Sequence, residues 1–593
     1  MEVKKVLDIK NLSFTYPLAK KKAINNLNFE INKGEFVLMC GSSGSGKTTL
    51  AKCLNGIIPH LANGNIEGDV IVNGKNTQDV KMHEISSEIG MVFQNPEDQI
   101  FSIRVDDEVA FGVECQGYKR DEIVKRVKYA LKKLRIEDIS RHLTFSLSGG
   151  QKQKVSIASN LAMLPSIIIL DDPTTDLDPI SKQEVMDILQ ELKNEVDVTF
   201  IVIEHDLTDL LEFADRVIVM HDGEIILNGK PDQIFYEQFL LLDKIGVRIP
   251  DHIRLGKYLI EQGIISAKDG YPIKKETLKK LTRKAILNRS LIIPDIKYKD
   301  YTIKSTEKVA EIKHVNFTYP EAKKQTLFDV NFDIYKGEFF GIVGHNGSGK
   351  STIMKNILGL LKPTSGDVFI NGKNTKDIDI SKLILDIGYV FQNPDNQLFC
   401  NTVREEIEFG LRDKNLPEDV IRKEADKALD IVELKAKEND HPFSLSRGQR
   451  QRLAVATMLV ANPKIIMLDE PTTGLDEKNL ASLLKLMQEI IYNFGGTLIM
   501  VTHDMEVVAK YATRVIVVNH GNVVLNGNPD EIFGNHYNEL DDLKLKPTII
   551  ASMSSELKDV SMPFIPNWDI FEKQVVNNNN SNEDNAKYIS SVI

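Results

Sequence analysis

The sequence predicts a duplicated α/β fold, in which two domains with parallel sheets are joined by a small helical segment. Three observations predict it: a long internal repeat, strand-like apolar runs that alternate with helix-like stretches in each half, and a length of 593 residues, which is too long for one domain. Hydrophobic residues make up 42% of the chain and charged residues 27%, so large cores can be buried.

The internal repeat is visible as motifs that recur at a nearly constant spacing. FTYP at 14–17 recurs at 317–320, and the lysines of GSSGSGKT and GHNGSGKS, Lys47 and Lys350, are also 303 residues apart. Later motif pairs, beginning with VFQNP, are 298 residues apart. The difference of 5 residues falls between Gly56 and Asp69, where the first half is longer. A period of this size indicates a duplicated domain rather than a solenoid.

The repeat divides the chain into four predicted parts. These are a first domain at 1–232, a linker or helical insertion at 233–305, a second domain at 306–540 and a C-terminal extension at 541–593. The 233–305 stretch shows no sequence copy in either half, and its 73 residues are too many for a bare connector. The Asn-rich run VVNNNNSNEDNAK predicts a partly disordered extension.

Charge and cysteine content exclude some classes of function. The net charge of −11 argues against a broad nucleic-acid or anionic-lipid surface. The 4 cysteines lack metal-ligand spacing, which predicts reduced thiols in a cytosolic protein. The N-terminus has no apolar signal-peptide core, and no apolar run reaches the roughly 18 residues that a spanning helix needs. Any role at a membrane would therefore depend on a partner.

Each half contains a glycine-rich loop of the form G-x-x-x-x-G-K-[ST], at 41–48 and at 344–351. Strand-like residues precede each loop and helix-forming residues follow it. Glycines let backbone N–H groups close around phosphate, and the helix N-terminus adds positive dipole. We expect Lys47 and Lys350 to reach the β- and γ-phosphates of a nucleotide, and Thr48 and Ser351 to offer hydroxyls to Mg²⁺.

Acidic residues follow a buried strand-like run in each half. Asp171 and Asp469 end these runs, where a carboxylate can support the metal through water. The next residue differs: LDEP places Glu470 to polarise the attacking water, whereas LDDP places the shorter Asp172 there. A general base must lie within hydrogen-bond reach of the water, and the shorter Asp172 side chain places its carboxylate farther away. We therefore expect slower hydrolysis at the Asp172 site. Asp172 acting as an adequate base after backbone adjustment stays open.

Two further motifs complete the set. LSGGQ at 147–151 and LSRGQ at 445–449 place Ser and Gly backbone groups ahead of a helix, which predicts a second anion site. Arg447 replaces the middle glycine and could crowd the nucleotide or add a charge contact. His205 in IEHD and His503 in VTHD match in position, and we expect both to contact a γ-phosphate.

The order of phosphate loop, VFQNP glutamine, LSGGQ signature, LDxP and terminal histidine resembles that of the ATP-binding cassette (ABC) family, over residues 5–232 and 308–535. The resemblance implies two P-loop NTPase domains that bind ATP and Mg²⁺ and pair head-to-tail. It further implies that Tyr16 and Tyr319 stack on adenine and that Gln94 and Gln392 link Mg²⁺ to a transport partner. In that arrangement the first phosphate loop, whose half carries Asp172, faces LSRGQ of the second half. Both departures from the family pattern, Asp172 and Arg447, therefore fall in one site.

The candidate residues follow by role. The candidate catalytic residues are Lys47, Gln94, Asp172, His205, Lys350, Gln392, Glu470 and His503. The candidate nucleotide-binding residues are Tyr16, Gly41, Ser42, Ser43, Gly44, Ser45, Gly46, Lys47, Thr48, Thr49, Ser148, Gly149, Gly150, Gln151, Tyr319, Gly344, His345, Asn346, Gly347, Ser348, Gly349, Lys350, Ser351, Thr352, Ser446, Gly448 and Gln449. The candidate metal residues are Thr48, Gln94, Asp171, Ser351, Gln392 and Asp469.

The stretch after the glutamine narrows the resemblance. QNPEDQIF at 94–101 and QNPDNQLF at 392–399 look like the segment after the glutamine in energy-coupling-factor (ECF) transporter ATPases, and 244–259 is similar to an insertion between their fused cassettes. This implies a subunit at the cytoplasmic membrane face with transmembrane T- and substrate-binding S-components as partners, for a vitamin or metal ion. A turn with a helix cap also explains the Asn-Pro-Asp run. A carbohydrate-importer ATPase and an ABC-F-like translation factor are the alternatives.

Overall fold

The structure is a computed structural model that divides into two compact units, unit 1 (Met1–Leu278) and unit 2 (Lys279–Ile593). It describes residues 4–17, 19, 21–175, 177–267, 270–301, 305–320, 322, 324–383, 386–412, 416–473, 475 and 477–576. The division falls at a different place from the predicted boundaries after 232 and 305. The Asn-rich run beyond 576, which was predicted to be disordered, lies outside the described residues.

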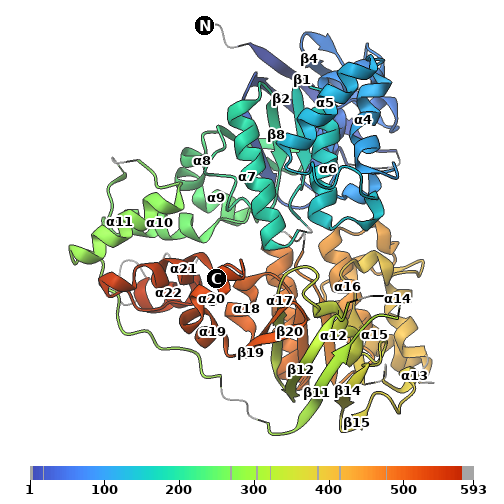
Figure 1. Cartoon of the computed structure of the whole chain (residues 1–593), viewed down its shortest axis with the longest axis vertical. Helices are drawn as coiled ribbons and strands as arrows, with labels where there is room; N and C mark the ends of the chain where they lie inside the picture. The colour runs from blue at the N-terminus through green and yellow to red at the C-terminus, as the bar shows by residue number, and fades with distance from the viewer. Residues whose placement is uncertain are drawn as a thin grey trace. The chain divides into compact units, whose positions relative to one another are not determined.

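Unit 1 has a four-stranded antiparallel sheet and a six-stranded, mainly parallel sheet in its described part (Figure 1). The antiparallel sheet has the order β2-β1-β4-β5 and consists of β1 (Lys5–Thr15), β2 (Ile24–Asn32), β4 (Asn65–Val72) and β5 (Lys75–Asn76). The larger sheet has the order β10-β9-β3-β8-β7-β6 and consists of β3 (Phe36–Gly41), β6 (Ile89–Val92), β7 (Ile167–Asp171), β8 (Thr199–Ile203), β9 (Arg216–His221) and β10 (Glu224–Gly229). Only β10 runs antiparallel to its neighbour there.

The strand β7 shows why an unbroken apolar run becomes a strand here. Its residues are all buried. Ile167 and Ile169 pack on the face that meets the antiparallel sheet, whereas Ile168 and Leu170 join the core under the helices. Successive side chains of a strand point to opposite faces, so a parallel strand covered on both faces is apolar throughout.

The helices of unit 1 fall into three groups. Those that connect strands of the sheets are α1 (Lys47–Leu54) with α2 (Ile57–His60), α3 (Met82–Glu88) and α7 (Pro179–Glu195). Those that pack on one another in a helical region are α4 (Val105–Cys115), α5 (Arg120–Lys133) and α6 (Gly149–Ala162). Those that follow the last strand, which we call the appended helices, are α8 (Pro231–Glu237), α9 (Phe239–Lys244) and α10 (Asp251–Glu261). The helix α11 (Lys275–Leu287) contains the boundary between the units.

Unit 2 repeats this architecture in the same strand order. Its antiparallel sheet β12-β11-β14-β15 consists of β11 (Lys308–Phe317), β12 (Leu327–Tyr335), β14 (Ser365–Ile370) and β15 (Lys373–Asn374). Its larger sheet β16-β17-β18-β13-β19-β20 consists of β13 (Phe339–Val343), β16 (Ile387–Val390), β17 (Ile465–Asp469), β18 (Thr497–Val501), β19 (Arg514–Asn519) and β20 (Asn522–Gly527). Its helices include α12 (Lys350–Ile357), α13 (Ile380–Leu383), α14 (Val403–Arg412), α15 (Glu418–Ile431), α16 (Arg447–Leu459), α17 (Glu477–Phe494) and α18 (Met505–Tyr511).

The appended helices correct one sequence-based expectation. The stretch after 232 was expected to have no copy, yet α8, α9 and α10 recur in unit 2 as α19 (Pro529–Asn535), α20 (Tyr537–Asp542) and α21 (Ile549–Glu556). Their first residues keep the offset of 298. The repeat was missed because its sequence identity, PDQIF against PDEIF, ends with the first helix, and beyond it the copies share helix positions more than letters. Phe235 and Phe533, for example, are both fully buried in their units.

The C-terminal extension of unit 2 is folded as far as residue 576. It adds the short helix α22 (Trp568–Phe571) and contacts the segment that follows the unit boundary. Tyr298 donates its hydroxyl to the Phe564 carbonyl (3.1 Å), and Lys297 donates its amide to Gln574 Oε1 (2.7 Å). Across the described residues of both units, no helix combines the length and the apolar character needed to cross a bilayer.

Candidate nucleotide sites

The two glycine-rich loops lie between a buried strand and a helix, as predicted. In unit 1 the loop joins β3 to α1, and in unit 2 it joins β13 to α12. The Lys47 ammonium donates to the carbonyls of Gly41 (2.9 Å) and Ser42 (3.0 Å), and it is 5% exposed. Lys350 repeats these contacts, since its ammonium donates to the Gly344 carbonyl (2.7 Å) and to the carbonyl of the next residue. Each lysine therefore folds over its own loop.

The loop glycines are required by backbone geometry. Gly41 has a φ of +146°, and a Cβ atom there would lie 2.0 Å from the Met220 carbonyl oxygen. Gly344 is placed in the same way, with a φ of +155° and the Val518 carbonyl oxygen 2.3 Å from a Cβ position. Any side chain would push the loop away from the neighbouring strand and open the cradle of N–H groups.

Oxygen ligands suited to Mg²⁺ meet at the first loop. Thr48, at the start of α1, donates its hydroxyl to Asp171 Oδ1 at 3.3 Å. Burial raises the pKa of the Asp171 carboxyl, while the Thr48 hydrogen bond and the Lys47 charge oppose that shift. Hydroxyl and carboxylate oxygens are the ligands that Mg²⁺ prefers, so these two residues fit the ion.

The second site differs in detail. Asp469 Oδ2 accepts a hydrogen bond from the Tyr389 hydroxyl at 3.0 Å, a contact that sequence reasoning missed. Burial also raises the pKa of the Asp469 carboxyl. The position 298 residues before Tyr389 is Met91, so this hydroxyl belongs to the second site's sequence alone. A tyrosine in the strand next to the acidic strand is the signal that could have found it.

The carboxylates after Asp171 and Asp469 sit on matching backbone. Asp172 and Glu470 both have a φ of +48°, and each amide donates to the carbonyl of the adjacent strand at 2.9 Å. Both residues are about 7% exposed. With the same φ and the same amide contact, the Asp172 carboxylate is one methylene closer to its own main chain than the Glu470 carboxylate. The slower hydrolysis expected at the Asp172 site stays a prediction.

The histidines lie beside these carboxylates because their strand pairs with the acidic strand. His503 Nδ1 is 2.6 Å from Glu470 Oε2, whereas His205 Nε2 is 3.7 Å from Asp172 Oδ2. Burial alone would lower the pKa of His503, but the charge and hydrogen bond of Glu470 raise it overall. Unit 2 thus joins its carboxylate and histidine directly, and unit 1 holds the same pair farther apart.

The signature motifs begin helices in both units. Ser148 caps α6 by accepting from the Gln151 amide (3.3 Å), while Gln151 Oε1 accepts from the Ser148 amide (3.0 Å). Ser446 and Gln449 form the same capping box at α16, at 3.4 and 3.0 Å. Gly448 has no room for a side chain, since a Cβ would lie 2.5 Å from Asn479. Arg447 is the first residue of α16.

The predicted adenine contacts lie at the loops. The Tyr16 hydroxyl is 3.1 Å from Thr49 Oγ1, and the Tyr319 hydroxyl is 3.1 Å from Thr352 Oγ1. Each tyrosine ring is therefore fixed beside the residue that follows its loop. Tyr16 is 38% exposed, so its ring can take part in stacking.

The segment after each VFQNP glutamine forms a capped turn. Gln94 and Gln392 are exposed. Asn95 Oδ1 accepts from the Glu97 amide (3.1 Å), and Asn393 repeats this with the Asp395 amide (3.0 Å). The turn-and-cap interpretation is thus confirmed for both copies. It does not account for the sequence that follows each turn.

Exposed phenylalanines follow these turns on the helical region. Phe101 and Phe111 meet edge to face with ring centroids 4.5 Å apart, and they are 63% and 44% exposed. Phe399 and Phe409 repeat the pair at 4.8 Å, with 64% and 50% exposed. Large exposed aromatic groups that recur at one position mark an interaction surface.

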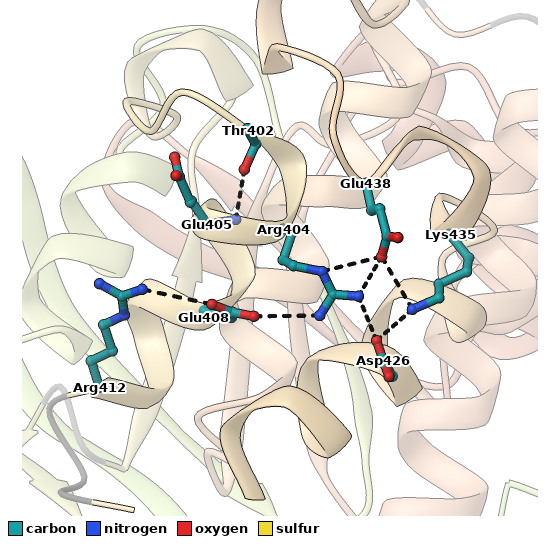
Figure 2. A network of polar contacts seen from close by, with 8 residues as sticks. All are labelled: Thr402, Arg404, Glu405, Glu408, Arg412, Asp426, Lys435 and Glu438. Carbon is teal, nitrogen blue, oxygen red and sulfur yellow. Dashed lines mark hydrogen bonds and ion pairs between the residues drawn. The ribbon is translucent and has the colours of Figure 1, made fainter. Parts of the chain in front are cut away.

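The helical region of unit 2 is braced by a network of ion pairs (Figure 2). Arg404 of α14 pairs with Glu408 (3.3 Å), with Asp426 of α15 (2.6 Å) and with Glu438 in the turn that leads to the signature. Lys435 also pairs with Asp426 (2.5 Å). The network ties α14, α15 and the turn together, so it steadies the segment that carries LSRGQ.

Phosphate loops at the carboxyl ends of parallel strands, each with an acidic strand and a histidine beside it, define a tandem P-loop nucleotide-binding protein. The sequence model of the family described as ABC transporter matches residues 24–175 and 327–473. The chain belongs to this family, and it is an ATPase. In both units the expected α/β cassette fold is confirmed.

Similar proteins share nearly the whole length. The chain is 40% identical over 555 residues to a provisionally named ABC transporter ATP-binding protein of Methanosarcina mazei, covering 92% of this chain and 93% of that one. It is 39% identical over 561 residues to one of Caldanaerobacter subterraneus, covering 93% and 96%. The solved structure of CbiO1 from Clostridium perfringens, part of the ABC transporter complex CbiONQ, is 38% identical and covers 40% of this chain and 95% of that chain, with a TM-score of 0.37.

Proposed function

We propose that the protein is the ATP-hydrolysing energy-coupling subunit of an ECF-type importer. It would act at the cytoplasmic membrane face with a transmembrane T-component and a substrate-binding S-component that takes a vitamin or metal ion. The exposed phenylalanine pairs carry this proposal. Phe101 and Phe399 end the QNPEDQIF and QNPDNQLF segments, and with Phe111 and Phe409 they offer apolar surface that the chain leaves in water.

The chain's own residues support ATP hydrolysis in the following way. Lys47 and Lys350 lie over their loops, where they can neutralise the β- and γ-phosphates. Thr48 with Asp171 would hold Mg²⁺ at the first loop, and Gln94 would complete the ligands. Ser351, Asp469 and Gln392 would do so at the second. When bound, the ion neutralises the charge that develops on the transferred phosphoryl group.

The acidic residue and the histidine beside it activate the attacking water. Glu470 accepts a proton from the water, and His503 holds the carboxylate and contacts the γ-phosphate. Asp172 and His205 occupy the same places with a wider gap. Hydrolysis then proceeds mainly at the second loop, while both loops bind ATP and each signature closes on the loop of the other cassette. Closing and opening would be transmitted to the membrane partner near Gln94 and Gln392.

The test is purification from native membranes in mild detergent, followed by identification of the proteins that come with the chain. We expect a small integral T-component and an S-component. Phe101→Ser combined with Phe399→Ser should abolish their recovery. Leu240→Ser combined with Val524→Ser serves as the matched control, because these residues are 55% and 44% exposed but lie on α9 and β20.

Other outcomes distinguish the alternatives. Recovery of a pair of permease subunits without an S-component would favour a carbohydrate importer. Recovery of ribosomal proteins without a membrane partner would favour a translation factor. If the phenylalanine and control variants lose the partners equally, the exposed pairs are not the docking surface.

A further inference from the structure

A network of charged residues surrounds the histidine of the first nucleotide site, and only Asp206 among its members has a charged equivalent in the second half, Asp504. Its members are Lys182 of α7, Glu204 directly before His205, Asp206 directly after it, and Asp209 four residues after it. We call residues 204–209 the histidine turn. The residues of unit 2 that lie 298 positions later are Thr502 for Glu204, Leu480 for Lys182, Val507 for Asp209 and Asp504 for Asp206. At three of these four positions the first site therefore carries a charge where the second has a hydroxyl or an apolar group.

Glu204 ties the histidine turn to the catalytic strand end. It is 2% exposed, and its Oε2 accepts from both the amide (3.3 Å) and the hydroxyl (2.9 Å) of Thr174, two residues after Asp172. Its Oε1 accepts from the His205 amide at 3.3 Å. In the described part of unit 2, the Thr502 hydroxyl instead accepts from the Asp504 amide (3.0 Å). The buried Glu204 carboxyl thus links His205 to Thr174, which lies close in sequence to Asp172, the residue expected to polarise the attacking water.

Two lysines form ion pairs with the aspartates of the histidine turn. Lys182 Nζ is 2.5 Å from Asp206 Oδ2, and Lys275 Nζ is 2.6 Å from Asp209 Oδ1. The pairs are partly buried, with side chains 21–33% exposed. Burial alone would raise the pKa of Asp206, but Lys182 and Arg248 hold it well below its ordinary range. Asp206 is therefore kept charged and paired in the folded unit.

Lys275 comes from outside the cassette motifs and is rigidly presented. The residues before it are anchored on the appended helices: Tyr236 donates its hydroxyl to the Pro272 carbonyl (3.0 Å), and a His252 ring nitrogen lies 3.1 Å from the Ile273 carbonyl oxygen. Tyr236 is 1% exposed and His252 is fully buried. The Lys275 amide also donates to Glu212 Oε1 (3.0 Å). The lysine can therefore transmit the position of the appended helices to the turn.

We propose that the appended helices of unit 1 set the position of His205 through Lys275 and the charged histidine turn, so that Lys275 is a positioning residue of the first nucleotide site. The inserted segment then has a role in ATP recognition. The inference concerns the nucleotide site itself and holds whichever membrane partner the chain binds.

The test measures how well the first site distinguishes a nucleotide with a γ-phosphate from ADP. The full chain carries Lys350→Ala, which removes binding at the second loop. Affinities for a non-hydrolysable ATP analogue and for ADP are measured by competition with a fluorescent nucleotide. His205→Ala should lower the affinity ratio most. Lys275→Met should lower it by about 2- to 30-fold, the range typical of residues that couple sites without contacting the ligand, and should leave ADP affinity unchanged.

The controls separate positioning from general damage. Lys274→Met alters the exposed neighbouring lysine and should keep the ratio of the parent chain, and Lys275→Arg should keep it because the charge is retained. Asp209→Asn should repeat the loss. The exchange of charges in Asp209→Lys with Lys275→Asp should recover part of it. An unchanged ratio in Lys275→Met and Asp209→Asn, or equal weakening of both nucleotides, would overturn the proposal.

Discussion

Replacing the carboxylate beside each histidine should have very different effects at the two sites. Glu470 and His503 form a close, largely buried ion pair at 2.6 Å, whereas the Asp172–His205 separation is 3.7 Å. A close contact between a buried carboxylate and a histidine contributes about 1.5–3 kcal/mol. At about 1.4 kcal/mol for each factor of ten, its loss slows the first site by about 10- to 150-fold. The first site then supplies about a tenth of total turnover at most.

The assay is steady-state phosphate release by the full chain at saturating ATP and Mg²⁺. Glu470→Gln should leave about a tenth of the rate or less, whereas Asp172→Asn should remove about a tenth at most. Asp172→Glu should raise the rate, because it restores the missing methylene on an unchanged backbone. Nucleotide binding is measured alongside, since both variants should still bind ATP. Equal losses in Glu470→Gln and Asp172→Asn would refute the asymmetry and the geometric reasoning behind it.

Three further predictions concern stability. Burial lowers the pKa of His252 to about 4 from 6.5. As the pH falls, the unfolded chain therefore binds a proton at this histidine before the folded chain does. The stability that is present above pH 6.5 is lost as the pH falls toward 4. The loss should reach about 3 kcal/mol, seen as extra hydrogen exchange in α10 at pH 4.5 that is absent in His252→Gln. Arg404→Met should destabilise α14 and α15 by about 1–3 kcal/mol in the same assay, whereas Arg412→Met, which loses a pair with Glu408 at 3.6 Å, should cost about 0.5 kcal/mol or less. Ser148→Ala removes a helix cap and should increase fraying at the start of α6 by about 1 kcal/mol; exchange no faster than in the parent chain would contradict it.

The phosphate loops and strand ends were predictable because their chemistry demands particular residues at particular spacings. A loop that encloses phosphate needs glycine where φ is positive, as at Gly41, and the lysine must follow at a set distance. The capped turns after Gln94 and Gln392 were also accessible, since Asn-Pro has one strong local preference. Local sequence was sufficient wherever local geometry decides the outcome.

Contacts between distant segments were not predictable in this way. The charged histidine turn depends on Lys275, which lies 66 residues from Asp209, and no local pattern joins them. The signal that was present is the change from Thr502 to Glu204 beside otherwise matching histidines. The repeat of the appended helices was hidden because its copies share conformation more than identity. Gly246 and Lys544, for instance, both adopt positive φ values of 76° and 56° after equivalent helices.

The appended helices also bear on how the chain can be divided. Ile234, Phe235, Leu242 and Ile253 belong to the same hydrophobic core as the strands and helices of the first cassette. A half-chain ending at the last strand would leave these partners without cover and expose apolar surface to self-association. The unit that was duplicated is therefore longer than the set of nucleotide-binding motifs. Anyone who expresses the halves separately, or splices one into another protein, should carry the three helices along with each cassette.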